Sequence, residues 1–384
     1  MHQVSLLPQW LLEHEQCYSL VTWEIVGYLS TGQQVWVSNE LLDAGEVPWG
    51  VQYFTELKAM KDVQKLDVLV GKPSDLQRVI DAECSFLLAR GYAEKDGRVV
   101  APRKDLAEDL ERVRTICSRI FSYNRFLAGK TLRGVKSSRI EYEECLTPGK
   151  WGGERFFENL QTNFCLYCNK GEVYYRRMTR TSVNGVSKST VQHTGYDHYF
   201  KKELYPYLAI SLYNLIPACD DCNQHKKTQI IMNAGAHSHP YIHDFHALMA
   251  FRTDFRKLRQ LQGCPRNLPL RLERRGSGLN DEQLAENLAS EIGLMSDYKA
   301  SAVVRDETIR VLRIMDSRLS EIANYRVRRK DLAWLAKKNQ IDFGFNLAEG
   351  EINLHCLAKL KIDLIAEYGL ENDLGQVGPK DGQI

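Results

Sequence analysis

The sequence predicts an α+β fold, mainly helical, in which a small cysteine-containing finger lies between helical N- and C-terminal domains. Apolar residues recur at helical spacing in both outer parts of the chain, and short strand patterns with two Cys-x-x-Cys pairs occupy the middle. The length of 384 residues suits two or three domains. Hydrophobic residues make up 43% and charged residues 26%, which excludes a mostly disordered chain. We expect three parts: 1–150, 151–270 and 271–384.

The first part, 1–150, is expected to be a mostly helical α+β domain. An amphipathic helix is predicted over 105–126, from the spacing of Leu106, Leu110, Val113, Ile116 and Ile120. Before it, Asp96-Gly97 between two short strand patterns predicts a hairpin. A helix followed by such a hairpin is typical of a winged-helix module and equally of other small α+β folds. The stretch 147–153, which contains glycine and proline, is the predicted linker.

The last part, 271–384, is predicted to be helical. Asn280 and Gln283 have the spacing of a capping box, at the start of a helix that carries Leu284, Leu288 and Ile292. A second apolar stripe consists of Ile309, Leu312, Met315, Leu319 and Ile322. Arginines share this second helix. We expect them to be solvated or paired with acidic neighbours, and the alternative is a phosphate-binding stripe.

Charge is distributed unevenly along the chain. The net charge of +2 divides into −2, +6 and −2 over 1–150, 151–270 and 271–384, and the middle part also holds seven of the ten histidines. Such a segment suits metal binding and a polyanionic partner such as nucleic acid. No apolar stretch approaches the ~18 residues of a membrane helix, and the first residues do not resemble a secretory signal. We therefore expect a reducing, cytoplasmic location.

Two cysteine pairs in the middle part predict a metal site. Cys165 and Cys168 form one Cys-x-x-Cys pair, and Cys219 and Cys222 form the other. Two such pairs can complete a closed, tetrahedral four-cysteine zinc site, which holds a fold together and leaves no position for a reacting water. A redox role is less favoured because no thioredoxin-like βαβ pattern surrounds either pair. The remaining cysteines are expected to be buried core thiols: Cys17, Cys84, Cys117, Cys145, Cys264 and Cys356.

The segment from about 164 to 251 resembles the HNH endonuclease family, also called ββα-metal or His-Me finger nucleases, in its zinc-stapled form. The resemblance rests on the first cysteine pair, then Tyr196-Asp197-His198-Tyr199, then Asn214-Leu215-Ile216-Pro217-Ala218-Cys219 and Cys222-Asn223-Gln224-His225-Lys226-Lys227. It implies a ββα-metal finger of two strands and a helix around one small site. It covers under a quarter of the chain.

The resemblance also implies roles for individual residues. His198 would be the general base and Asn214 the residue that braces the loop orienting it. Asp197 and Asn223 would be ligands of one catalytic Mg²⁺ or Mn²⁺; Asn223 stands where many members have histidine. His225, Lys226 and Lys227 are expected to face nucleic-acid phosphates, with metal contact as an alternative for His225. The histidine-rich segment from His237 to His246 is expected to pack against the finger or to lie near phosphate. The alternative is a second metal site on His239 and His243 or on His243 and Asp244.

The expected function is metal-dependent hydrolysis of DNA phosphodiester bonds, by nicking or cutting double-stranded DNA. The resemblance further implies a role in bacterial anti-phage defence or restriction, with a partner ATPase or sensor protein. The alternative is a non-catalytic zinc-finger adaptor that binds DNA or a partner protein. Because the flanking parts are slightly acidic, we also expect them to restrain the nuclease segment.

Overall fold

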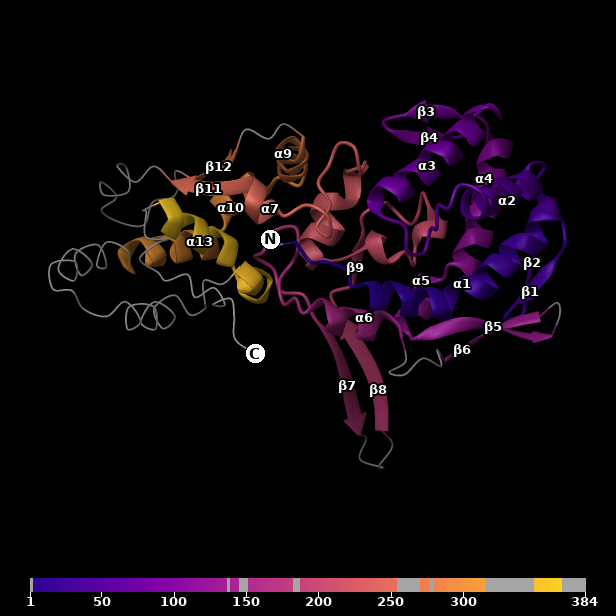
Figure 1. The fold of residues 1–384 in the computed structure, drawn as a ribbon, viewed down its shortest axis with the longest axis horizontal. Helices are drawn as coiled ribbons and strands as arrows, with labels where there is room; N and C mark the ends of the chain where they lie inside the picture. The colour runs from indigo at the N-terminus through magenta and orange to yellow at the C-terminus, as the bar shows by residue number, and fades with distance from the viewer. Residues whose placement is uncertain are drawn as a thin grey trace, which may run out of the picture.

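The chain has a mixed α+β architecture with small sheets, as the sequence predicts (Figure 1). The computed structural model describes residues 3–136, 139–144, 151–181, 187–253, 270–276, 280–314 and 349–367. Over these residues the largest sheet has four strands and the other four sheets have two each. None of the described helices is both long and apolar enough to cross a membrane.

The N-terminal part packs helices against the four-stranded sheet. Its helices are α1 (Pro8–Ser30), α2 (Gly50–Asp62), α3 (Pro73–Leu88), α4 (Lys104–Ile120) and α5 (Tyr123–Leu127). Its strands are β1 (Val35–Val37), β2 (Glu40–Leu42), β3 (Ala93–Lys95), β4 (Arg98–Val100), β5 (Lys130–Lys136) and β6 (Arg139–Glu144). The sheet order is β2-β1-β6-β5, in which β1 and β6 run parallel. The predicted hairpin is confirmed as β3–β4, with Asp96 and Gly97 both at positive φ in the turn.

The predicted helix over 105–126 is wrong at its end. All five residues of its apolar stripe are buried, but α4 ends at Ile120. Phe121 leaves the helical conformation (φ −100°, ψ 53°), and its buried ring packs edge-on against Trp23 at 6.4 Å. The chain then starts the separate helix α5. Because the helix breaks here, the Tyr123 side chain points in a direction that a continuous helix would not give it.

The middle part contains α6 (Gly153–Leu160), α7 (Phe245–Leu248) and strands β7 (Tyr175–Thr181), β8 (Ser187–His193), β9 (Tyr196–His198), β10 (Leu215–Pro217) and β11 (Met249–Thr253). Short helical turns cover Pro206–Leu208, Leu212–Asn214, Asp221–Lys226 and Lys227–Gln229. Strands β9 and β10 pair antiparallel, and the turns from Asp221 follow directly. Figure 1 shows β9 between the N-terminal helices and the C-terminal helices, while β7 and β8 project from the body.

The C-terminal part contains β12 (Leu270–Arg274), which pairs with β11, and helices α9 (Asp281–Glu291), α10 (Leu294–Ala300) and α13 (Ala358–Glu367). A further helix covers 302–314, where Arg310 pairs with Glu307 as expected. Met315, Leu319 and Ile322 lie outside the described residues. The helix predicted after Asn280 is confirmed as α9, but the capping box is not formed. Asn280 already has helical backbone angles, and the Gln283 side chain accepts a hydrogen bond from Arg274.

Two further expectations are corrected in the N-terminal region. Cys17 takes part in a disulfide bond and is therefore not a core thiol. Residues 151–153, the part of the predicted linker that the structure describes, are buried in the core. Trp151 is buried and donates its indole hydrogen to His14 Nδ1 at 3.0 Å. A side chain at Gly152 would begin 2.6 Å from the Gly129 backbone, so this close approach requires glycine.

Hydrogen bonds cross both predicted domain boundaries. On the N-terminal side, the Tyr207 hydroxyl donates to Glu83 Oε2 at 2.8 Å, and Leu212 N donates to Leu69 O at 3.0 Å. On the C-terminal side, the Tyr298 hydroxyl donates to Cys168 O at 2.5 Å. One hydrophobic cluster contains residues from all three parts. The finger is therefore held by the core of the whole chain.

Candidate functional site

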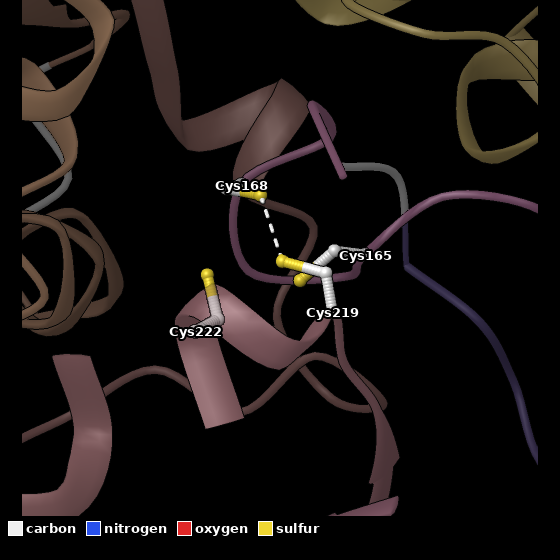
Figure 2. Close-up of side chains that lie close together, drawn as sticks. All are labelled: Cys165, Cys168, Cys219 and Cys222. Atoms are coloured by element: carbon white, nitrogen blue, oxygen red, sulfur yellow. Dashed lines mark hydrogen bonds between the residues drawn. The ribbon is translucent and has the colours of Figure 1, made fainter. Parts of the chain in front are cut away.

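The four paired cysteines come together as one buried cluster (Figure 2). Their sulfur atoms all lie within 4.8 Å of one another, and Cys168 Sγ is 3.8 Å from Cys219 Sγ. A tetrahedral zinc ion with Zn–S bonds of about 2.3 Å places its sulfurs about 3.8 Å apart. All four are free cysteines, not disulfides. The donor set and its spacing therefore fit a structural zinc ion held by Cys165, Cys168, Cys219 and Cys222. In the described part of the chain, no other group of three or more His, Cys, Asp or Glu side chains could hold a metal ion.

Local backbone geometry explains why the first cysteine pair converges. Asn169 N donates to Cys165 O at 2.8 Å, and Cys165 N donates to Gly171 O at 2.9 Å, which closes a tight turn. Asn169 has φ +50°, a conformation that asparagine tolerates. A Cβ at Gly171 would lie 2.5 Å from Cys219 Cβ and 2.6 Å from its Sγ. Glycine at this position therefore lets the two cysteine segments approach each other.

Asp197 and His198 lie on β9, which pairs with β10. His198 is opposite Leu215 and Asp197 is opposite Ile216 in the antiparallel register. Successive side chains of a strand point to opposite faces, so the carboxylate and the imidazole lie on different sides of β9. Both residues are buried. Their environments therefore have to be considered separately.

The Asp197 carboxylate is already engaged by two donors. Its Oδ2 atom accepts a hydrogen bond from the Tyr167 hydroxyl at 2.7 Å and forms a buried ion pair with Lys227. Lys227 Nζ also donates to His198 O at 2.7 Å and Tyr199 O at 3.2 Å. Burial lowers the pKa of Lys227, and the charge of Asp197 opposes that shift. Lys227 thus holds the end of β9. The expectation that it faces nucleic-acid phosphates is wrong, because its ammonium is buried against Asp197.

His198 is held as a neutral imidazole. Its Nε2 atom lies 3.0 Å from the Ala209 carbonyl oxygen, and the Tyr123 ring packs edge-on against it with centroids 4.7 Å apart. Burial, with help from the charges of Lys202 and Lys227, lowers the pKa of His198 to about 3. A carbonyl oxygen can only accept, so Nε2 must carry the ring hydrogen. Nδ1 then carries the lone pair that a general base needs.

Asn214 braces the loop that follows β9. It is fully buried, and its Oδ1 accepts from Phe200 N at 2.6 Å. Its Nδ2 donates to Phe200 O at 3.0 Å and to Leu208 O at 2.9 Å. The loop between these two residues leads directly to Ala209, whose carbonyl contacts His198. Asn214 therefore positions the imidazole through the backbone and does not contact it.

The remaining predicted residues lie on the helical turn after the second cysteine pair. Asn223 is partly buried, and its backbone N donates to Cys219 O at 2.9 Å. Its Nδ2 atom lies 3.7 Å from the position that a Cβ on Gly195 would occupy. His225 is exposed. Lys226 Nζ is 2.6 Å from Asp221 and 2.8 Å from Asp297, so its charge is paired within the protein.

The residues as arranged do not form a ready site for a catalytic divalent cation. The ammonium of Lys227 lies where the resemblance would place the cation, at Asp197 Oδ2. Oxygen-rich ligand sets suit Mg²⁺ and Mn²⁺, but a divalent cation and an ammonium group repel each other at one carboxylate oxygen. A cation can bind this carboxylate at Oδ2 only if Lys227 moves away.

Sequence reasoning missed Tyr167 and Tyr123, which contact Asp197 and His198. Tyr167 lies between the two cysteines of the first pair, and the turn there explains why it is buried. Nothing in the sequence shows that its hydroxyl contacts Asp197. Tyr123 was placed within a longer helix. The histidine-rich segment packs against the finger as expected. His239 Nε2 lies 2.7 Å from Tyr213 O, and its ring centroid is 4.5 Å from that of Tyr199.

Comparison of the chain with protein-family models, curated proteins and solved structures finds no match to any of them.

Proposed function

We propose that this protein is an endonuclease that hydrolyses DNA phosphodiester bonds, with His198 as general base. The observation that carries the proposal is the state of His198: a neutral imidazole whose Nε2 hydrogen is held by Ala209 O, so that Nδ1 can accept a proton. A positioned general base typically contributes a rate factor of about 10² to 10⁴, most when its pKa lies near the working pH. Since the pKa of His198 is about 3, the proposal requires the negative charge of a bound phosphate to raise it. Asn214 and Tyr123 fix the ring, and Asn214 does so through the loop that ends at Ala209.

The two metal ions have different roles in this proposal. Zinc on the four cysteines cross-links the two halves of the finger and takes no part in the reaction. The Mg²⁺ or Mn²⁺ that the resemblance implies, with Asp197 and Asn223 as its ligands, would have to displace Lys227 from Asp197 Oδ2. The proposed substrate is double-stranded DNA. A role in anti-phage defence or restriction with a partner ATPase or sensor, in the cytoplasm, belongs to the same proposal.

The Lys227–Asp197 ion pair favours a second candidate, a non-catalytic zinc-finger adaptor. A buried ammonium that permanently neutralises Asp197 would leave the carboxylate as a structural group. Under this alternative the finger would bind DNA or a partner protein without cleaving DNA.

A plasmid assay with the zinc-loaded, full-length protein separates the two candidates. Supercoiled DNA is incubated with EDTA, Mg²⁺ or Mn²⁺, and binding to the same DNA is measured in parallel. The nuclease proposal expects nicked or linear product with a divalent cation and none with EDTA. It also expects Asp197→Asn, which keeps an acceptor for Tyr167 and Lys227, and Asn223→Ala to lose cleavage while they keep zinc and DNA affinity. Bound but intact DNA under every condition would favour the adaptor.

A further inference from the structure

The β7–β8 hairpin is a two-stranded ribbon that projects from the body of the molecule (Figure 1). Its strands, Tyr175–Thr181 and Ser187–His193, pair antiparallel in continuous register over seven residue pairs. At about 3.3 Å per residue, each strand is roughly 23 Å long. The ribbon is therefore long enough to contact a partner away from the body.

The ribbon carries most of the excess positive charge of the middle part. Residues 174–193 contain four basic residues and no aspartate or glutamate: Arg176, Arg177, Arg180 and Lys188. Residues 151–270 as a whole have a net charge of +6. By contrast, Lys226 and Lys227 are paired with acidic groups inside the protein. The lysines first expected to bind phosphate are thus occupied, and the ribbon offers the alternative.

The strand register brings basic positions of the two strands together. Arg180 is paired with Lys188 across the strands, and Arg176 lies four residues before Arg180 on the same strand, so the period of two puts all three positions on one face of the ribbon. No aspartate or glutamate occurs between residues 174 and 193. This face therefore has the composition of a surface that binds a polyanion.

The root of the ribbon is fixed next to the candidate site. The Tyr175 hydroxyl donates to Leu127 O at 2.8 Å, and the Tyr175 and His193 rings stack with centroids 5.3 Å apart. Thr194 N donates to Tyr174 O at 3.1 Å. His193 and Asp197 are four positions apart in the chain, so their Cα atoms are at most about 14 Å apart. A duplex bound along the ribbon would thus pass close to β9.

We propose that the β7–β8 hairpin is the arm with which this protein binds the phosphate backbone of double-stranded DNA. This inference rests on the proposed function, since it names the surface that brings the substrate to His198. The DNA major groove, about 12 Å wide, admits a two-stranded ribbon, and arginine and lysine supply the phosphate contacts that dominate affinity. Such contacts position the duplex without selecting a sequence.

The test replaces Arg176, Arg177, Arg180 and Lys188 with glutamine in the full-length, zinc-loaded protein. Binding to a short labelled DNA duplex is measured without divalent cations, between about 50 and 200 mM salt. We expect affinity to fall at least about tenfold at the lower salt, and the slope of log K against log salt to become shallower by up to about 3.6, which is 0.9 for each lost contact. The matched control removes four exposed basic residues of the N-terminal part, Arg78, Arg103, Lys104 and Arg112. The control should keep both affinity and slope.

Unchanged affinity and slope in the arm variant would overturn the proposal. So would tighter binding to single-stranded DNA or RNA than to the duplex, or no binding to DNA by the wild type. Thermal melting and zinc content show whether the variant folds, and the pair Arg180→Gln with Lys188→Gln provides a milder version. Plasmid cleavage is scored separately. If the wild type cleaves DNA and the arm variant binds DNA as tightly as the wild type, only the arm proposal is wrong. If the arm variant loses binding but the wild type never cleaves DNA, only the nuclease proposal is wrong.

Discussion

At the scale of single residues, Asp197 divides its interactions between the hydroxyl of Tyr167 and the ammonium of Lys227. The competition between Lys227 and an added cation can be measured directly. Replacing Lys227 with glutamine removes a positive charge but keeps a hydrogen-bond donor. We expect Lys227→Gln to bind Mn²⁺ at least about tenfold more tightly than the wild type, equivalent to about 1.4 kcal/mol.

Mn²⁺ binding to the zinc-loaded protein, followed by electron paramagnetic resonance, provides the measurement. Lys170→Gln is the control, because Lys170 pairs with Asp297 and lies in the same segment. Equal Mn²⁺ affinity in wild type and Lys227→Gln would show that Lys227 does not compete for the cation.

The cysteine cluster supports a second prediction at this scale. Because zinc-binding free energy contributes directly to folding, Cys219→Ser should lose the zinc and give unfolded or insoluble protein. Cys84→Ser, which removes a half-buried thiol outside the cluster, should remain folded with one zinc per chain. Elemental analysis and thermal melting measure both variants. A soluble Cys219→Ser protein with wild-type zinc content and melting would refute the site.

At the scale of elements, local patterns were predictable and long-range partners were not. The cysteine turns, the Asp96-Gly97 hairpin and the stripe of α4 each depend on residues close in sequence, so sequence alone shows them. The end of α4 depends on how Phe121 packs against Trp23, and no local pattern encodes that contact. The Lys227–Asp197 pair joins residues thirty positions apart. A lysine after a cysteine pair has no visible partner in the sequence.

The loop after β9 provides a test of element stability. Asn214→Ala leaves Phe200 N and Phe200 O without their partner, whereas Leu208 O keeps its hydrogen bond from Ser211 N. Since each unpaired buried group costs about 1–3 kcal/mol, we expect a loss of at least about 2 kcal/mol in the free energy of unfolding. Urea unfolding measures this loss. Asn214→Asp, which keeps the acceptor for Phe200 N but places a buried carboxylate oxygen against Phe200 O and Leu208 O, should lose at least as much. An Asn214→Ala protein of wild-type stability would mean that the loop does not need this brace.

At the scale of the whole molecule, buried groups connect the finger to both flanking parts. Glu83 on α3 accepts hydrogen bonds from Tyr53 and Tyr207, one from each side of the predicted boundary at 150. Asn169 of the first cysteine turn donates to Ile352 O at 2.9 Å. An isolated 151–270 fragment would lose these contacts. The expected restraint of the nuclease by its flanks stays a prediction, and it needs to be tested in the full chain.

Buried histidines make the stability of the whole chain depend on pH. Burial lowers the pKa of His14, His198, His239 and His246 to about 3, whereas the unfolded value is 6.5. Below pH 6.5 the unfolded chain binds more protons than the folded one, so stability falls as pH decreases from 6.5 towards 3. We expect each histidine to cost about 1 kcal/mol between about pH 7.5 and 5.5.

Urea unfolding at the two pH values tests this dependence, with zinc content checked at both. His14→Gln should show a smaller loss than the wild type because one of the four groups no longer titrates. Equal stability at both pH values would contradict the burial of these imidazoles in neutral form.

The central claim is that His198 is the base of a DNA-cleaving site, and the rate of plasmid nicking tests it most directly. The rate is measured with Mn²⁺ for the full-length wild type, for His198→Ala, and for His243→Ala as a histidine control from the same part of the chain. All three proteins are matched for zinc content and DNA affinity. We predict that His198→Ala lowers the rate at least about 100-fold and that His243→Ala leaves it within about twofold of the wild type. Nicking by His198→Ala at the wild-type rate would contradict the account.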